Sequence, residues 1–271
     1  MIHLYQIKKT QANSVTLPDM SSLDAITRQL PDGYYSTFRT YDHCTRVIGL
    51  SAHLRRLPNA DASALRRHLL LLLEPYRTTN GEVRVRIMET KQGQFYVSLE
   101  PLKPLPREVY ENGVRVETTS LHRNDPRTKS TAFISASAEE RKHIAKEGIF
   151  EALLVKNGKI LEGMTSNFFY VVKRDNIPLY LGTAQRDILL GVTRRMVIRV
   201  ARSRGVEVKY QPLKLNQLSA AKEAFITSSS RGIVPVIQID EFKVGEGYPG
   251  NSTKMLMAAY DEYVLKQAEK I

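Results

Sequence analysis

The sequence predicts an α+β fold, in which helices and strands mix without a regular strand–helix–strand alternation. Three observations support this class. Residues 83–88 alternate apolar side chains with arginine and methionine, as a strand with two differently lined faces does. Asn157-Gly158 separates two apolar runs, which suits a hairpin turn of type I′. Residues 192–204 place apolar side chains at helical spacing before Gly205, a typical helix stop.

The first third of the chain contains both periodicities. We expect a strand at 34–41 and a helix that opens at the cap-type residue Asp61 and ends before 78–81. The apolar run Leu69–Leu73 is interpreted as the buried stripe of this helix, because a bilayer span needs about 20 residues. Further strands are expected at 83–88, at 95–99 after a turn at Gln92-Gly93, and at 114–117.

The remainder begins with a predicted helix at 137–147, stopped by Gly148. The hairpin 151–156/159–161 then places Glu162 at the far end of a rigid strand. One face of the 192–204 helix is shared by apolar residues, namely Val192, Met196, Val197, Val200 and Ala201. Other strands are expected at 167–172, 206–210, 224–227 and 233–239. A final helix, 252–266, is expected to bury Met255, Leu256, Ala259, Tyr260 and Tyr263.

Size and composition indicate a globular protein. The 271 residues are 42% hydrophobic and 25% charged, enough for one large domain or two modest ones. The single cysteine, Cys44, excludes an internal disulfide framework, so we expect a reducing cytoplasm. The first residues lack the order of a secretory signal. A proline-containing connector at 121–127 predicts two domains, residues 1–120 and 128–271.

The net charge of +12 raises the question of a nucleic-acid partner. Lysine and arginine are scattered among acidic residues, and the basic stretches lack interleaved aromatic residues. One segment does crowd its basic residues, namely Arg194, Arg195, Arg199, Arg202 and Arg204. We interpret it as a solvated basic face that attracts anionic substrates.

Two residues carry the chemistry that points to an enzyme. The amine of Lys129 can form a reversible imine with an aldehyde, and the carboxylate of Glu162 can hold a pyridine nitrogen protonated. Either residue alone would mean little. Together they predict pyridoxal phosphate as the cofactor, and we expect no metal site.

Two segments could bind a phosphate group. Gly191-Val192-Thr193 opens a predicted helix, where unpaired amides and the helix dipole favour an anion. The segment 227–232, Thr-Ser-Ser-Ser-Arg-Gly, offers hydroxyls beside flexible backbone. Neither contains a Walker or dinucleotide pattern. Taken singly, a helix cap and a loop are the favoured interpretations.

As an ordered set, these residues resemble the fold-type IV pyridoxal-phosphate enzymes. This family includes branched-chain and D-amino-acid aminotransferases, (R)-selective amine transaminases and aminodeoxychorismate lyase. The matching pieces are Tyr35, 53–57, Lys129, 162–167, 191–194, Ser228-Ser229 and 235–237. The resemblance implies a two-domain fold, with a smaller N-terminal α/β domain and a larger C-terminal domain of mixed strands and helices forming a pseudo-barrel.

The resemblance also implies roles for individual residues. Lys129 would bind the cofactor and shuttle the proton, and Glu162 would pair with the pyridinium N–H. The residues implied around the phosphate and the ring are Arg56, Val192, Thr193, Ser228, Ser229 and Leu189. Arg56 could instead be a surface arginine, Leu189 a core leucine and Ser229 a turn residue.

Substrate contacts follow from arginine chemistry, because a guanidinium matches a carboxylate bidentately. Arg84 and Arg86 share one face of their strand with Met88; an exposed basic strand face is an equally weighted alternative. Tyr35 and Arg123 are further candidates, and so is Arg231. Arg231-Gly232 and residues 27–34 depart from the family pattern, so specificity is not transferred there.

The favoured function is a pyridoxal-phosphate-dependent aminotransferase that moves an amino group between a branched-chain or D-type amino acid and a 2-oxo acid. A cytoplasmic homodimer is implied. One alternative is an aminodeoxychorismate lyase that releases 4-aminobenzoate and pyruvate from the same scaffold. The other is a catalytically inactive, basic nucleic-acid-binding protein.

Overall fold

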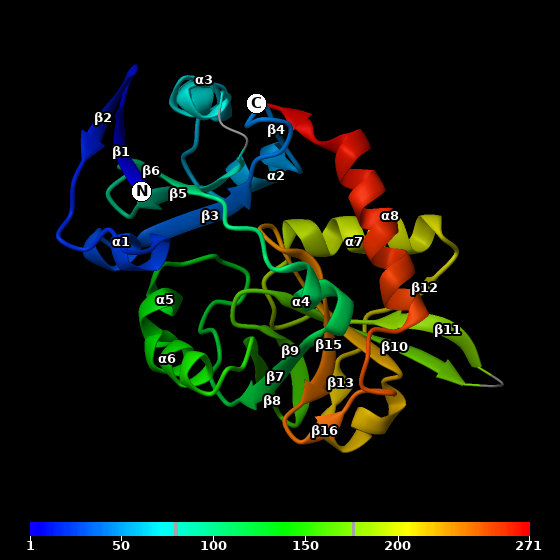
Figure 1. Cartoon of the computed structure of the whole chain (residues 1–271). Helices are drawn as coiled ribbons and strands as arrows, with labels where there is room; N and C mark the ends of the chain where they lie inside the picture. The colour runs from blue at the N-terminus through cyan, green and yellow to red at the C-terminus, as the bar shows by residue number, and fades with distance from the viewer. Residues whose placement is uncertain (79–80, 175–176) are drawn as a thin grey trace. The chain divides into compact units, whose positions relative to one another are not determined.

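The computed structural model describes residues 1–78, 81–174 and 177–271 (Figure 1). Contacts between Cα atoms divide the chain into two compact units. The first comprises 1–103, 128–136 and 264–271, and the second comprises 104–127 and 137–263. The segment that holds Lys129 therefore groups with the N-terminal part of the chain. The domain limits drawn at 120 and 128 stay a prediction.

The first unit contains an antiparallel five-stranded sheet, seen in blue to blue-green in Figure 1. Its strands in spatial order are β2 (Gln11–Val15), β1 (His3–Lys8), β6 (Phe95–Pro101), β5 (Val83–Thr90) and β3 (Gly33–Arg39). Two short strands, β4 (Arg46–Val47) and β17 (Glu269–Lys270), pair separately and bring the end of the chain to this unit.

Helices cover both faces of this sheet. They are α1 (Leu23–Gln29), α2 (Leu50–Leu54), α3 (Ala62–Leu73) with the 3-10 turn η1 (Glu74–Tyr76), and α5 (Ala132–Ala136). Apolar side chains of α2 and α3 pack on Val83, Val85 and Ile87 of β5. Met88 packs on the other face, with Ile26 of α1 and Ile134 of α5. The predicted two-faced strand is confirmed.

Helix α3 begins after Asp61, whose carboxylate accepts hydrogen bonds from the amides of Ser63 and Ala64, as a helix cap does. The expectation of a continuous buried stripe at Leu69–Leu73 is wrong. Leu69 and Leu73 are buried, whereas Leu71 is 70% exposed. Five consecutive residues of a helix point around more than one full turn, so one face cannot bury them all. Of the predicted helix end at 78–81, residues 79 and 80 lie outside the described residues.

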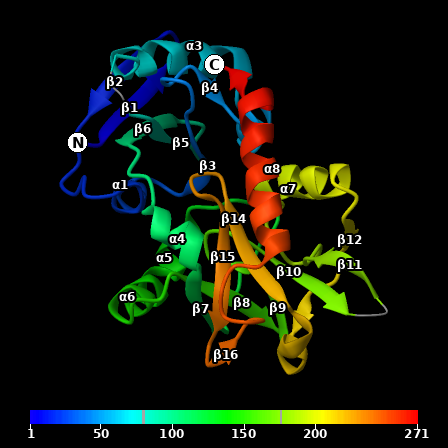
Figure 2. The same ribbon diagram turned by 45° about the vertical axis from the view of Figure 1, so that its right-hand side comes forward.

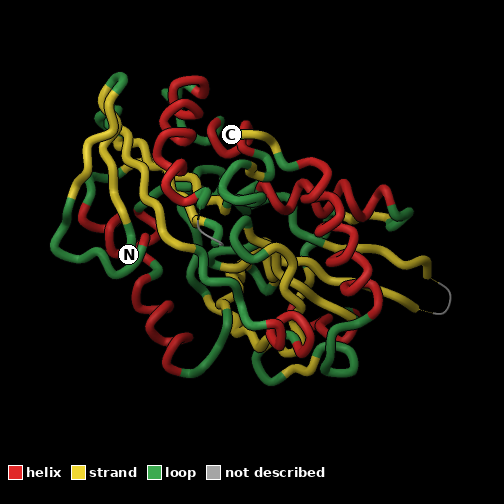
Figure 3. Tube along the Cα trace, turned by 45° about the horizontal axis from the view of Figure 1, so that its top comes forward, coloured by secondary structure: helices red, strands yellow, loops and turns green. Residues whose placement is uncertain are grey.

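The second unit contains a closed strand arrangement, whose strands are labelled in Figure 2. Figure 3 shows the strands of the chain in yellow and its helices in red. Six strands follow one another as β10 (Asn167–Arg174), β14 (Glu223–Ser228), β15 (Gly232–Ile239), β7 (Val114–Thr119), β8 (Glu151–Lys156) and β9 (Lys159–Gly163). A pairing of β9 with β10 closes the ring. The predicted pseudo-barrel is confirmed. The flanking strands are β11 (Ile177–Gly182), β12 (Glu207–Lys209), β13 (Leu213–Lys214) and β16 (Phe242–Lys243).

The helices of this unit are α4 (Arg107–Asn112), α6 (Ala138–Lys146), α7 (Val192–Ser203), the 3-10 helix η2 (Leu215–Ala220) and α8 (Asn251–Gln267), whose last turn reaches the first unit. The predicted helices at 137–147, 192–204 and 252–266 are confirmed. Of their expected core residues, Met196, Met255 and Tyr263 are half-buried rather than buried. None of the helices in the described ranges is long and apolar enough to cross a bilayer.

The β8–β9 hairpin has the predicted turn. Asn157 and Gly158 have φ values of 51° and 67°, as type I′ requires. Because the strands are antiparallel, Glu151 at the start of β8 and Glu162 near the end of β9 both lie at the open end of the hairpin.

Candidate active site

The carboxylate of Glu162 lies among hydrogen-bond donors, and the residue is 1% exposed. Its Oε1 accepts from Arg123 Nε at 3.0 Å. Its Oε2 accepts from Asn167 Nδ2 at 3.1 Å and from the Leu189 amide at 3.0 Å. All three neighbours donate, which suits an ionised carboxylate that only accepts. Each oxygen of a carboxylate can accept more than one hydrogen bond.

Asn167 holds the elements around this carboxylate together. It opens β10 opposite Glu162, and its Nδ2 also donates to the Leu189 carbonyl at 2.8 Å. A Cβ on Gly191 would lie 2.0 Å from Asn167 Oδ1, so no larger residue fits there without moving the amide. The start of α7 therefore packs against the same asparagine that supports Glu162.

The start of α7 offers an anion site. No side chain caps this helix, so the amides of its first turn lack a side-chain acceptor. Thr193 Oγ1 lies 3.3 Å from Ser229 Oγ in the β14–β15 turn. Thr227 Oγ1, two residues before Ser229, is buried and has no hydrogen-bond partner among the described residues. Amides, hydroxyls and the helix dipole together suit a phosphate group.

Arg194 contradicts the expected solvated face. Its side chain was predicted among five surface arginines, but the residue is 2% exposed. It donates to the Ala184 carbonyl at 2.7 Å and to Gln185 Oε1 at 2.8 Å. Burial lowers the pKa of Arg194 to about 10. The other arginines of the segment, Arg195, Arg199, Arg202 and Arg204, are exposed as predicted.

Lys129 lies in the first unit, in the loop before α5. Its backbone is fixed, because the Tyr35 amide donates to the Lys129 carbonyl at 3.0 Å and Ser130 forms a β-bridge with Tyr34. Its Nζ is 4.7 Å from the centre of the Tyr35 ring. The Arg86 guanidinium carbon is also 4.7 Å from that centre. Tyr35 thus brings the proposed nucleophile and a predicted substrate arginine to one aromatic ring.

Arg86 is enclosed rather than on an exposed basic strand face. It is 8% exposed and donates to Leu23 O, Thr27 Oγ1 and Thr37 Oγ1 at 2.8–3.0 Å. An ion pair with Asp24 at 2.8 Å completes this set. Arg84 pairs with Glu100 at 2.5 Å and is more accessible. A role of either arginine in substrate binding stays a prediction.

The other predicted residues are found as follows. Arg56 is half-buried just after α2, in the first unit. Leu189 is 9% exposed, and its amide contacts Glu162. Arg123, predicted to bind substrate, lies on Glu162 and also donates to the Met164 carbonyl at 2.7 Å. Residue type alone did not indicate roles for Asn167, Glu151 and Thr165, although Asn167 and Thr165 lie in the motif 162–167.

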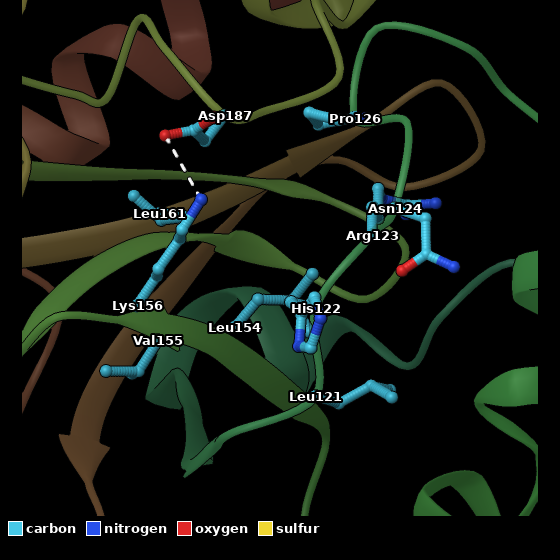
Figure 4. A pocket seen from close by; sticks show the side chains of 10 residues that line it. All are labelled: Leu121, His122, Arg123, Asn124, Pro126, Leu154, Val155, Lys156, Leu161 and Asp187. Carbon is cyan, nitrogen blue, oxygen red and sulfur yellow. Dashed lines mark ion pairs between the residues drawn. The ribbon is translucent and has the colours of Figure 1, made fainter.

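The loop that carries Arg123 also borders a pocket of the second unit (Figure 4). The pocket is lined by Leu121, His122, Arg123, Asn124, Pro126, Leu154, Val155, Lys156, Leu161 and Asp187. Lys156 Nζ lies 3.8 Å from Asp187 Oδ2 on one side of it. Arg123 therefore lines this pocket and also contacts Glu162, whereas Asn167 and Leu189 do not line it.

The sequence profile of the family Amino-transferase class IV matches residues 33–239. The chain belongs to this family. A Methanocaldococcus jannaschii protein, provisionally named a branched-chain-amino-acid aminotransferase, is 30% identical over 89% of this chain and 90% of its own length. Aminodeoxychorismate lyase of Bacillus subtilis is 28% identical over 86% of this chain and 85% of its own length.

Among solved structures, a hypothetical aminotransferase from Mycobacterium tuberculosis in its PLP-bound form has a TM-score of 0.76. It is 19% identical, and the match covers 97% of this chain and 99% of that one. This likeness shows the shared fold. The predictions of a fold-type IV architecture and of a class IV aminotransferase are therefore confirmed.

Proposed function

We propose that this class IV aminotransferase binds pyridoxal 5′-phosphate through the amine of Lys129 and the carboxylate of Glu162. The observation that supports this most strongly is the buried Glu162 carboxylate, held by three N–H donors at the end of a rigid strand. Burying a carboxylate is costly unless it is paired and hydrogen-bonded, and a buried ionisable group that the fold supports in this way marks a candidate functional site. When bound, the cofactor supplies an aldehyde for the lysine and a ring that accepts electrons.

The residues of this chain then have separate tasks. Glu162 would hold the ring N–H, and the amides of Val192 and Thr193 with the hydroxyls of Thr193, Ser228 and Ser229 would hold the phosphate. Arg56 would add positive charge there, and Leu189 would pack on the ring. Lys129 would move the substrate proton, because an amine positioned at the reacting carbon can act as a general base.

The experiment is a visible absorption spectrum of the purified protein with pyridoxal phosphate. After unbound pyridoxal phosphate is removed, the wild type is expected to keep the visible absorption band of an imine, and Lys129→Ala should lose it because no amine remains to bond the aldehyde. Lys91→Ala, at an exposed lysine in the β5–β6 turn, is the matched control and should keep the band. An unchanged spectrum in Lys129→Ala would contradict the proposal.

The substrates are proposed to be a branched-chain or D-amino acid and a 2-oxo acid. The Methanocaldococcus relative supports the branched-chain option. Incubation with L- and D-amino acids plus 2-oxoglutarate tests the proposal, and a keto acid product is expected. The absence of any keto acid from the whole panel would refute the transaminase assignment.

The Bacillus subtilis relative supports a second candidate, a lyase on the same scaffold. Incubation with 4-amino-4-deoxychorismate should release 4-aminobenzoate and pyruvate if this candidate is right. A cytoplasmic homodimer remains part of the proposal. Its support is the family resemblance and the single cysteine, and sedimentation would measure the oligomeric state.

A further inference from the structure

Arg231 is held rigidly in the turn between β14 and β15. Its Nε donates to Ser228 Oγ at 3.0 Å, and its Nη2 donates to Thr165 Oγ1 at 2.6 Å and to Glu151 Oε2 at 3.2 Å. The guanidinium also lies over the Phe150 ring, 5.1 Å from its centre. The side chain is therefore positioned on both its edge and its face.

The backbone of Arg231 is fixed as well. The two residues that flank the turn, Ser228 and Gly232, are paired in the sheet. The Tyr110 hydroxyl donates to the Arg231 carbonyl at 2.9 Å. Arginine loses much conformational freedom when it is ordered, so a side chain already held in this way binds a further partner at a lower entropic cost.

A donor count shows which part of the guanidinium remains for a ligand. Arginine has five N–H donors. One on Nε and two on Nη2 are used by the three contacts of the first paragraph. The two on Nη1 have no hydrogen-bond partner among the described residues, and Nη1 is not one of the buried unpartnered atoms. With 22% of the side chain exposed, Nη1 is the group that solvent or a ligand can reach.

Charge selects the kind of ligand. Glu151 is 2% exposed and neutralises part of the guanidinium charge from the Nη2 side. A doubly charged phosphate is better served by the uncapped start of α7. A singly charged carboxylate suits a half-neutralised guanidinium, and it can leave again after each turnover.

Two connections relate this guanidinium to the proposed cofactor site. Thr165, its Nη2 partner, belongs to the turn between Glu162 and Asn167. Ser229, in the same turn as Arg231, contacts Thr193 at the start of α7. Resting on the proposed function, we propose that Arg231 Nη1 binds a carboxylate group of the amino-acid and 2-oxo-acid substrates and thereby sets their affinity.

The test uses the holoenzyme with Arg231→Met, which keeps a long side chain on Phe150 but removes every N–H. The KM for amino acids and 2-oxo acids should rise about 10–100-fold, the range for one hydrogen bond to a charged group. The kcat and the affinity for pyridoxal phosphate should change less than about 3-fold. Arg199→Met, at an exposed arginine of α7 that contacts Tyr263, is the matched control.

The substrate panel distinguishes the two possible carboxylates. A KM increase for leucine, alanine and glutamate alike assigns Arg231 to the α-carboxylate. A KM increase confined to glutamate, aspartate and 2-oxoglutarate assigns Arg231 to a side-chain carboxylate. A primary amine without a carboxylate should react equally well with wild type and variant. Unchanged KM values throughout, or a loss of cofactor affinity without a KM effect, would overturn the inference.

Because Arg231→Met leaves Glu151 buried without its arginine, the double variant Arg231→Met/Glu151→Gln guards against misfolding. It should show the same KM increase with a wild-type circular dichroism spectrum. A wild type that shows no visible band with pyridoxal phosphate would refute the proposed function itself, and this inference with it. A normal band with unchanged KM values in both variants refutes the Arg231 inference alone.

Discussion

Two glutamate–arginine pairs lie at the open end of the β8–β9 hairpin, and they differ in which partner is available to a ligand. Glu162 receives donors on both oxygens, and its partner Arg123 is only 5% exposed. Glu151 directs one oxygen to Thr165, Ser166 and Arg231, and this arginine remains 22% exposed. The same ion pair therefore offers a ligand an acceptor in one place and a donor in the other. The difference lies in the arginine, which is enclosed in the first pair and partly exposed in the second.

Glu162→Gln and Glu151→Gln should separate the two pairs most strongly. Both replace a buried carboxylate by an amide of the same shape. Glu162→Gln is expected to lower kcat by about 10²–10³-fold, the usual effect of removing one preorganised electrostatic contact. Glu151→Gln should act on KM, with kcat within about 3-fold, because it only orients Arg231. Steady-state kinetics on purified holoenzyme measure both, and equal losses of kcat would abolish the distinction.

The second test concerns stability at the enclosed pair. Arg123→Met leaves the Glu162 carboxylate buried without its cation, so the free energy of unfolding should fall by about 3–5 kcal/mol. The double variant Arg123→Met/Glu162→Gln should recover much of this loss, because no unpaired charge remains. Urea unfolding followed by circular dichroism measures the difference. If the double variant is no more stable than the single one, Arg123 acts through packing rather than charge.

A third test acts on the support of Glu162 without touching either pair. Gly191→Ala places a Cβ 2.0 Å from Asn167 Oδ1, and the shift needed to relieve this should cost about 1–3 kcal/mol. Binding of pyridoxal phosphate should weaken too, because α7 begins directly after this residue. Gly81→Ala is the control, since no atom lies within 4 Å of its added Cβ. Equal melting temperatures for the two variants would contradict the close packing.

The smallest effect is expected at a third pair, Arg66 with Glu269 in the first unit, whose side chains are 28% and 33% exposed. Burial alone would raise the pKa of Glu269, but hydrogen bonds from Ser51 and Arg66 outweigh it and lower the pKa below its ordinary 4.5. A carboxyl with a lower pKa in the folded chain stabilises it above that ordinary value, and this contribution is lost as the pH falls through the folded pKa.

Glu269→Gln should therefore reduce the free energy of unfolding by up to about 1 kcal/mol at pH 7, since the pair is partly solvated. The difference from wild type should shrink below pH 4.5, as chemical unfolding at several pH values would show. A difference that is independent of pH would mean that Glu269 acts by packing its strand β17 rather than through its charge.

Local features were accessible from the sequence because they depend on neighbours in the chain. Asn157-Gly158 requires positive φ at two adjacent residues, and Asp61 caps a helix that starts at the next residue. The end of β9 followed from that turn, which is why Glu162 was found correctly at the end of a strand. The predicted position of Lys129 rested on the order of family motifs, and its role stays a proposal.

The burial of individual arginines could not be predicted from neighbours in the chain. Arg86 and Arg194 occupy positions that periodicity leaves open to solvent, yet both are buried with several acceptors. Arg123 meets its carboxylate across 39 residues of sequence. A guanidinium is buried only where acceptors converge, and those acceptors come from segments that the fold alone brings together.

By itself the sequence determined the α+β class and the strands and helices that follow from short-range patterns. It also supplied the residue types, a lysine and a glutamate, that can bind a pyridine aldehyde. Only the tertiary structure decided that the loop of Lys129 belongs to the same unit as Tyr35. It also decided that Arg123 is buried against Glu162, whereas Arg231 stays partly exposed beside Glu151. The reason is that the charge of a side chain is fixed by its residue type, whereas the burial of that charge here depends on a closed ring of strands that are far apart in the chain.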